Sequence, residues 1–180
     1  PKAHATAYVM MAVRVAYFKV FYPLEYYATF FSVRSKQYDL KAMIGGAEAM
    51  LLKLQQIKSD REKNNLTPKD AEIEKTLHIA VEMVDRGYKI LNVDLYKSSA
   101  TSFTIDYERK AIMPPFNVVD GLGDNTAHTV IEARANGPFI SIEDLLSRTK
   151  LNSQNIERLK ELGTLDNLPE TNQINLFDFC

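Results

Sequence analysis

The segment "FNVVDGLGDNTAHTVIEAR" (116–134) constrains the fold most, because a turn with two glycines, Gly121-Leu122-Gly123, leads straight into a helical pattern. Glycine permits backbone angles that other residues avoid, and it places no Cβ between the peptide N–H groups and a ligand. The helix that follows adds free N–H groups and the positive end of its dipole. We expect Leu122 to anchor this turn in the core. The turn is therefore either a phosphate cradle without basic residues or an ordinary connection between helices that needed glycines.

Composition is that of an ordinary globular protein, with 46% hydrophobic and 25% charged residues and a net charge of −1. Nothing in the overall charge points to nucleic acid. The single cysteine, Cys180, excludes an internal disulfide framework and a cysteine-rich zinc site. No Walker sequence, metal-ligand pair or nucleophile motif is present, so we predict no catalytic residue and no metal site in this chain.

The rest of the pattern predicts a mainly α fold with a small β element. Helices are expected on either side of Pro23, from residue 47 onward, and from the cap at Thr67-Pro68 to Gly87. Alternation over roughly 89–113 predicts a small strand unit that Pro114-Pro115 closes. Short helices follow, with starts at Ser141 and Asn152. The stretch "LKELGTLDNL" is similar to a second, degenerate hairpin around Gly163.

Residues 116–134 match the helix-hairpin-helix pattern, and several other stretches extend the likeness to a single family. "KAHATAYV" and "NVDLYKSSAT" are the most specific, and "IMPPFNVVDGLG", "EARANGPFISIEDLLSR" and "NQINLF" follow in the same order. Essentially the whole chain resembles the C-terminal part of C-family bacterial replicative DNA polymerases of the PolC type. The missing initiator methionine and the apolar start also suggest a piece of a longer polypeptide.

The resemblance implies three parts: residues 1–88 as the C-terminal helices of the fingers domain, 89–170 as a duplex-binding domain containing the small β element and the helix-hairpin-helix, and 171–180 as a flexible tail. The backbone of double-stranded DNA would be held without sequence specificity by the turn and by the N–H groups that follow it. Those residues are Gly121, Leu122, Gly123, Asp124 and Asn125.

The resemblance also implies that His4 and Lys2 lie near the incoming deoxynucleoside triphosphate. The parent protein would be a template-directed DNA polymerase that uses Mg²⁺. The aspartates that bind this metal would lie upstream of Pro1, so the fragment should be inactive alone and hold no cofactor. The resemblance places such a protein in the bacterial cytoplasm, associated with the nucleoid and not with a membrane.

The tail "QINLF" resembles the peptide by which this family binds its sliding clamp, the β subunit. Gln173 can hydrogen-bond at one end of a groove, while Ile174, Leu176 and Phe177 are spaced to fill an apolar pocket. The alternative is a tail that folds back over its own domain.

Two other hypotheses fit the residues. The first is a standalone helix-hairpin-helix module of DNA repair, which a start codon just before Pro1 would favour. The second is a helical adaptor that recruits the clamp and ignores DNA.

Overall fold

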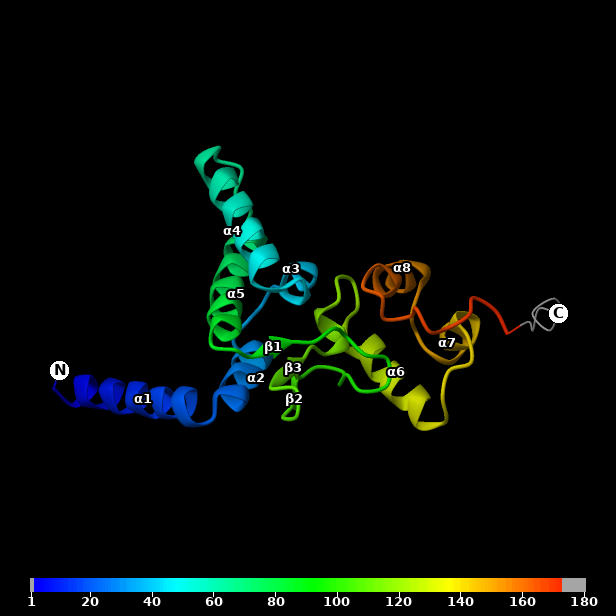
Figure 1. The fold of residues 1–180 in the computed structure, drawn as a ribbon, viewed down its shortest axis with the longest axis horizontal. Coiled ribbons are helices and arrows are strands. Elements are labelled where there is room, and N and C mark those ends of the chain that lie inside the picture. The colour runs from blue at the N-terminus through cyan, green and yellow to red at the C-terminus, as the bar shows by residue number, and fades with distance from the viewer. Residues whose placement is uncertain (1, 173–180) are drawn as a thin grey trace. The chain divides into compact units, whose positions relative to one another are not determined.

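The computed structural model describes residues 2–172, and within them it shows a mainly helical chain with one small sheet (Figure 1). The elements in chain order are α1 (Lys2–Phe21), α2 (Pro23–Val33), α3 (Leu40–Ile44), α4 (Gly46–Glu62), α5 (Pro68–Asp85), β1 (Lys89–Ile90), β2 (Thr104–Asp106), β3 (Ala111–Met113), the 3-10 turn η1 (Phe116–Val118), α6 (Asp124–Ala135), α7 (Ile142–Arg148) and α8 (Ser153–Glu161). The predicted fold class is confirmed.

The described residues form two compact units. Residues 2–91 and 102–112 make the first unit, and residues 92–101 and 113–172 make the second. The first unit thus contains most of the strand segment, which the sequence assigned to the domain of the hairpin. The reason is pairing: β1 runs parallel to β3 with Lys89 opposite Ala111, in a sheet of order β1-β3-β2. The functional domain boundaries themselves stay a prediction.

In the first unit, α4 and α5 lie side by side as an arm (Figure 1). The predicted start of α5 is confirmed as a reciprocal capping box, in which Thr67 and Asp70 each accept from the other's backbone N–H. As the sequence predicted, α5 ends just before Gly87, which has a left-handed φ of +88°. Apolar side chains on the inner faces, including Met50, Ile57 and Leu77, are buried and join the two helices.

One helix of this unit, α3, was not predicted, and another, α1, is exposed. Helix α3 begins after Asp39, whose carboxylate accepts from the N–H of Ala42 at 3.0 Å. Helix α1 buries none of its residues, although it is apolar on most sides, with Met11, Phe18 and Phe21 all more than half exposed. Its link to the unit includes an ion pair of 2.6 Å between the ammonium of Lys19 and the carboxylate of Glu82 on α5.

The second unit is built from α6, α7 and α8 around Phe116, Val130, Leu145 and Leu159, all fully buried. The predicted caps at Ser141 and Asn152 are both present. At the Ser141 cap, the carboxylate of Asp144 also accepts from the N–H of Ile140, the residue before the cap, at 3.2 Å. The second hairpin expected around Gly163 is wrong: Gly163 has φ +72°, but only turns follow it up to residue 172.

Strand content was overpredicted in this unit. The stretch "NVDLYKSS" forms a turn, because the carboxylate of Asp94 accepts from the N–H groups of Tyr96 and Lys97 at 2.8 and 2.9 Å. The buried hydroxyl of Ser98 closes the turn by donating to the carbonyl of Pro114 at 2.8 Å.

Candidate nucleic-acid interface

The turn between η1 and α6 has the geometry expected of a phosphate cradle. Gly121 has φ +77°, in the left-handed region that favours glycine. Gly123 is the N-cap of α6 and makes no side-chain cap, so the first N–H groups of this helix have no partner within it. Leu122, only 2% exposed, anchors the turn in the core as the sequence predicted. Asp124 and Asn125 form the exposed first turn of α6.

The two glycines are needed for different reasons. A side chain at Gly121 would be strained by its φ whatever space surrounds it. Gly123 has an ordinary φ of −77°, and a Cβ built there would have no atom within 4 Å. Neither backbone conformation nor packing therefore requires glycine at 123. Glycine is a favoured N-cap residue, and at this position it also leaves the free N–H groups open to close approach by a ligand.

The turn is held from two sides by side-chain amides. Asn155 of α8 is 3% exposed and donates through Nδ2 to the carbonyl of Gly121 at 3.0 Å. Its Oδ1 accepts from the N–H of Asn152 at 3.2 Å, so one amide serves both the cap of α8 and the hairpin. Asn117 donates to the carboxylate of Asp124 at 2.9 Å. The sequence showed the start of α8 at Asn152, but no local pattern indicated that Asn155 reaches a turn thirty-four residues earlier.

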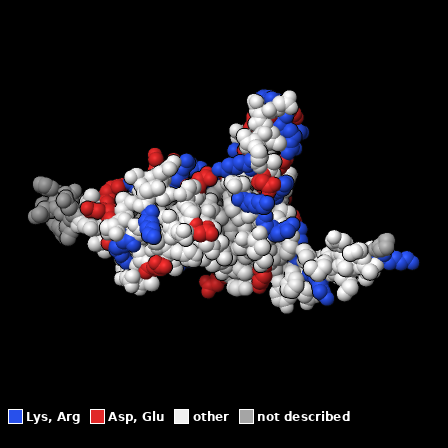
Figure 2. Space-filling view, turned by 180° about the vertical axis from the view of Figure 1, so that it is seen from behind, with Lys and Arg blue, Asp and Glu red and all other residues white. Residues whose placement is uncertain are grey.

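The charge around the turn opposes tight anion binding. Asp120 and Asp124 flank it, and no lysine or arginine occurs between Lys110 and Arg134. A phosphate here would be held by peptide dipoles alone, against two carboxylates. Figure 2 shows one face of the second unit, on which red and blue side chains are scattered among uncharged ones. Such a contact is weak and independent of base sequence.

Arg134, at the C-terminal end of α6, fixes the turn formed by "NVDLYKSS". Its guanidinium donates to the carbonyls of Leu95 and Ser98 at 3.2 and 2.8 Å. Burial lowers its pKa, while Asp94 opposes that shift. Asp94 thus has a structural role in this turn.

Lys2 and His4, the predicted nucleotide-binding residues, are exposed in the first turns of α1 and belong to the first unit. Their side chains make no hydrogen bond or ion pair within residues 2–172, and their proposed role stays a prediction. The predicted clamp-binding residues, Gln173, Ile174, Leu176 and Phe177, lie outside the described residues.

Neither a metal site nor a membrane span is found in the part of the chain that the structure describes. Across residues 2–172, no three His, Cys, Asp or Glu side chains come together as a possible metal site. No helix in this same range is long and apolar enough to cross a membrane.

Comparison with known proteins agrees with this geometry. The family described as "Helix-hairpin-helix motif" matches residues 87–174, which include the Gly121–Gly123 turn and the helices after it. The second unit therefore carries a helix-hairpin-helix motif.

Comparison over the whole of this chain identifies a more specific family. The chain is 47% identical over 178 residues to the DNA polymerase III PolC-type of Streptococcus sanguinis (strain SK36), and equally identical to that of Streptococcus thermophilus (strain ATCC BAA-491 / LMD-9). It is 44% identical to the protein of the same name from Streptococcus agalactiae serotype III (strain NEM316). The match covers 99% of this chain but 12% of each relative. Over the part that it spans, the chain belongs to the PolC-type DNA polymerase III family.

Proposed function

We propose that this chain is the duplex-holding, C-terminal part of a template-directed replicative DNA polymerase. The observation that carries the proposal is Gly123, a glycine that the fold does not require, placed at the uncapped start of α6 inside the helix-hairpin-helix motif. Free N–H groups at such a helix start bind phosphate oxygens without reading bases. A polymerase must move along any sequence, so weak backbone contacts suit it.

Catalysis belongs to the rest of the parent protein in this proposal. The parent uses Mg²⁺ and deoxynucleoside triphosphates, with the metal held outside this chain and the incoming nucleotide near His4 and Lys2. The exposed apolar side chains of α1 support a larger assembly, because large exposed apolar surfaces usually mark a contact. The chain alone should extend no primer, and incorporation of nucleotide by it would contradict this assignment.

The decisive experiment changes the two glycines separately. Gly123→Val should lower the melting temperature only slightly, through the loss of a favoured N-cap residue, yet weaken duplex binding about tenfold, because the new side chain stands where a phosphate would approach. Gly121→Val should lower both, since a left-handed φ costs a non-glycine residue about 1–2 kcal/mol. Fluorescence anisotropy with two unrelated duplex sequences measures the affinity, and differential scanning calorimetry measures the stability.

Gly87→Val is the matched control, because Gly87 has a similar φ of +88° at the end of α5 and also has open space around it. It should lower stability while leaving duplex affinity intact. If Gly123→Val binds duplex as tightly as the unchanged protein does, the turn is an ordinary connection and the proposal is wrong.

Tethering to the sliding clamp is the second part of the proposed function. It rests on "QINLF" alone, in which apolar side chains at 174, 176 and 177 follow Gln173 in an extended-peptide spacing. Leu176→Ala combined with Phe177→Ala should abolish capture by immobilised clamp while duplex affinity stays the same. Equal capture by the double variant would leave the tail without this role.

A further inference from the structure

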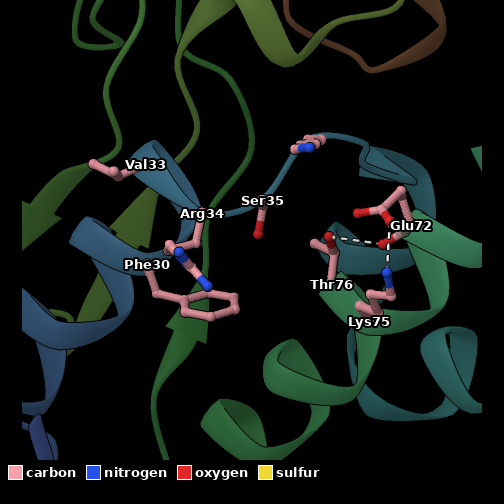
Figure 3. A pocket seen from close by; sticks show the side chains of 8 residues that line it. Phe30, Val33, Arg34, Ser35, Glu72, Lys75 and Thr76 are labelled. Carbon is pink, nitrogen blue, oxygen red and sulfur yellow. Dashed lines mark hydrogen bonds and ion pairs between the residues drawn. The ribbon is translucent and has the colours of Figure 1, made fainter. Parts of the chain in front are cut away.

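A second candidate site lies in the first unit, where the end of α2 and the segment after it face α5 (Figure 3). The pocket has a volume of about 410 Å³. Its lining includes an aromatic ring, three cations, a hydroxyl and a carboxylate, which belong to Phe30, Arg34, Lys36, Lys75, Ser35 and Glu72. The hairpin is not involved, because all of these residues belong to the first unit.

The pocket has an excess of positive charge. Lys75 is paired with Glu72 at 2.6 Å, so these two charges largely cancel. The hydrogen bond from Lys75 lowers the pKa of Glu72, and the charge of Lys36 adds a smaller lowering, which keeps this carboxylate ionised. Arg34 and Lys36 make no side-chain hydrogen bond or ion pair within residues 2–172. Two cations without an ion pair therefore line one pocket.

The hydroxyl of Ser35 is the unusual group. Its Oγ is buried and has no hydrogen-bond partner within the described residues. Buried polar groups are almost always paired, because an unpaired one forfeits its bonds to water. In Figure 3 the hydroxyl points into the space between the end of α2 and the side chains of Glu72, Lys75 and Thr76. A ligand atom in the pocket would supply the missing partner.

The segment that carries these groups is held in place from both sides. The hydroxyl of Tyr38 donates to the carbonyls of Phe31 and Ser35, the latter at 3.1 Å. On α5, the hydroxyl of Thr76 donates to the carbonyl of Gln37 at 2.9 Å. Tyr38 also satisfies a carbonyl in the last turn of α2, which offsets part of the negative dipole end of that helix. The backbone of this segment is thus held in place before a ligand arrives.

We propose that this pocket binds a phosphate group of a nucleotide or of a nucleic-acid strand. A phosphate has several oxygens that can accept together from the planar fork of Arg34, the ammonium of Lys36 and the hydroxyl of Ser35. The ring of Phe30 beside them offers a face on which a base can stack. The pocket can be tested with inorganic phosphate, so the result of that test does not depend on whether the hairpin binds DNA.

The test uses the whole chain and three probes at constant ionic strength: sodium phosphate, sodium acetate and a five-residue oligothymidylate. Binding is followed through the amide chemical shifts of residues 34–37 in two-dimensional NMR. We expect phosphate and the oligonucleotide, but not acetate, to move these shifts. A tighter fit for the oligonucleotide identifies a strand as the source of the phosphate, whereas equal affinity identifies a free phosphate or nucleotide.

Arg34→Gln with Lys36→Gln should weaken phosphate binding about tenfold, because both charge-assisted hydrogen bonds are removed. The matched control is Lys58→Gln with Lys63→Gln, which removes the same charge from two exposed positions at the far end of α4. The control should change the affinity less than about twofold, because its charges lie on the surface away from the pocket. An equal loss in both double variants would show general charge attraction and overturn the proposal.

Ser35→Ala separates a ligand site from a structural role. Because the hydroxyl has no partner in the free protein, its removal should leave the melting temperature unchanged or raise it, while phosphate binding weakens several-fold. Unchanged binding by this variant, or acetate binding as tight as phosphate binding, would overturn the proposal. So would the absence of any shift at residues 34–37 with phosphate or oligonucleotide at about 10 mM, a ceiling beyond the millimolar range of weak binding.

Discussion

The Gly121–Gly123 turn and the Arg34–Lys36 segment are both short connections after a helical turn, but they offer a phosphate opposite chemistry. The turn presents backbone N–H groups at the start of α6, beside two carboxylates and without a cation. The segment presents two cations without ion pairs and an unpartnered hydroxyl, among the residues that the structure describes. A buried or half-buried side chain from outside braces each of them, Asn155 for the turn and Tyr38 for the segment.

This difference teaches that phosphate binding need not follow net charge. A contact made by peptide dipoles displaces few counterions, whereas a contact made by lysine and arginine displaces about one for each phosphate neutralised. The chain's net charge of −1 therefore says little about either site. It also means that salt, and not affinity alone, distinguishes the two sites.

The largest expected effect comes from removing the brace of the turn. Asn155→Leu removes both the donor to the carbonyl of Gly121 and the acceptor for the N–H of Asn152, which together cost about 1–3 kcal/mol of folding free energy. It also frees the turn to move, so duplex affinity should fall about tenfold, which corresponds to about 1.4 kcal/mol. Urea unfolding measures the change in stability, and fluorescence anisotropy measures the change in affinity.

Asn152→Ala is the control for that variant. It removes the cap of α8, worth about 1 kcal/mol, without touching Gly121. Stability should fall in both variants and duplex affinity only in Asn155→Leu. A parallel fall of affinity in both would mean that the second unit as a whole, and not the turn, determines binding.

A smaller effect should appear in the salt dependence. With a single-stranded oligonucleotide, the slope of log affinity against log salt should become shallower by about 0.7 for each phosphate that the Arg34→Gln, Lys36→Gln variant no longer neutralises. With duplex DNA, Gly123→Val should weaken binding at every salt concentration and leave the slope unchanged, because the variant removes no cation. A changed slope in Gly123→Val would contradict the dipole mechanism.

The sequence predicted the features that local chemistry determines. Thr67-Pro68 and Asn152 supplied caps, Gly87 supplied a left-handed residue after a helix, and Leu122 between two glycines supplied an anchored turn. Each of these signals lies close in the chain to the structure that it specifies. Propensity also predicted strands in "NVDLYKSS", but the turn made by Asp94 replaced them.

Long-range contacts were not predictable in this way. Asn155 looked like part of a cap, and nothing near it indicates the carbonyl of Gly121. No sequence signal marked Arg34, Ser35 and Lys36 as a site, because the pocket forms only where α5 faces them. The sequence also placed residues 102–112 with the hairpin, whereas pairing between β1 and β3 joins them to the first unit.

The smallest expected effect is a pH dependence to which Tyr38, beside the Arg34–Lys36 segment, contributes. Burial raises the pKa of Tyr38 to about 12, above the ordinary value of 10.0. The folded state therefore keeps the hydroxyl protonated where the unfolded state ionises. Below pH 10 this group gives no pH dependence, and stability should fall as the pH rises from about 10 to about 12. Tyr38→Phe should make the urea-unfolding free energy of the first unit fall less steeply over that range. Part of the fall should remain, because the pKa values of Tyr27 and Tyr107 in the same unit are also raised.

The same substitution removes the hydroxyl that braces the segment while leaving the ring in place. At neutral pH it should cost about 1 kcal/mol, the net worth of a typical hydrogen bond, and weaken phosphate binding several-fold. Thr67→Ala, which removes a cap of similar worth at the start of α5, serves as the control and should leave phosphate binding intact. If Tyr38→Phe keeps full phosphate affinity, the cations of the pocket act without a fixed backbone, and the parallel with Asn155 fails.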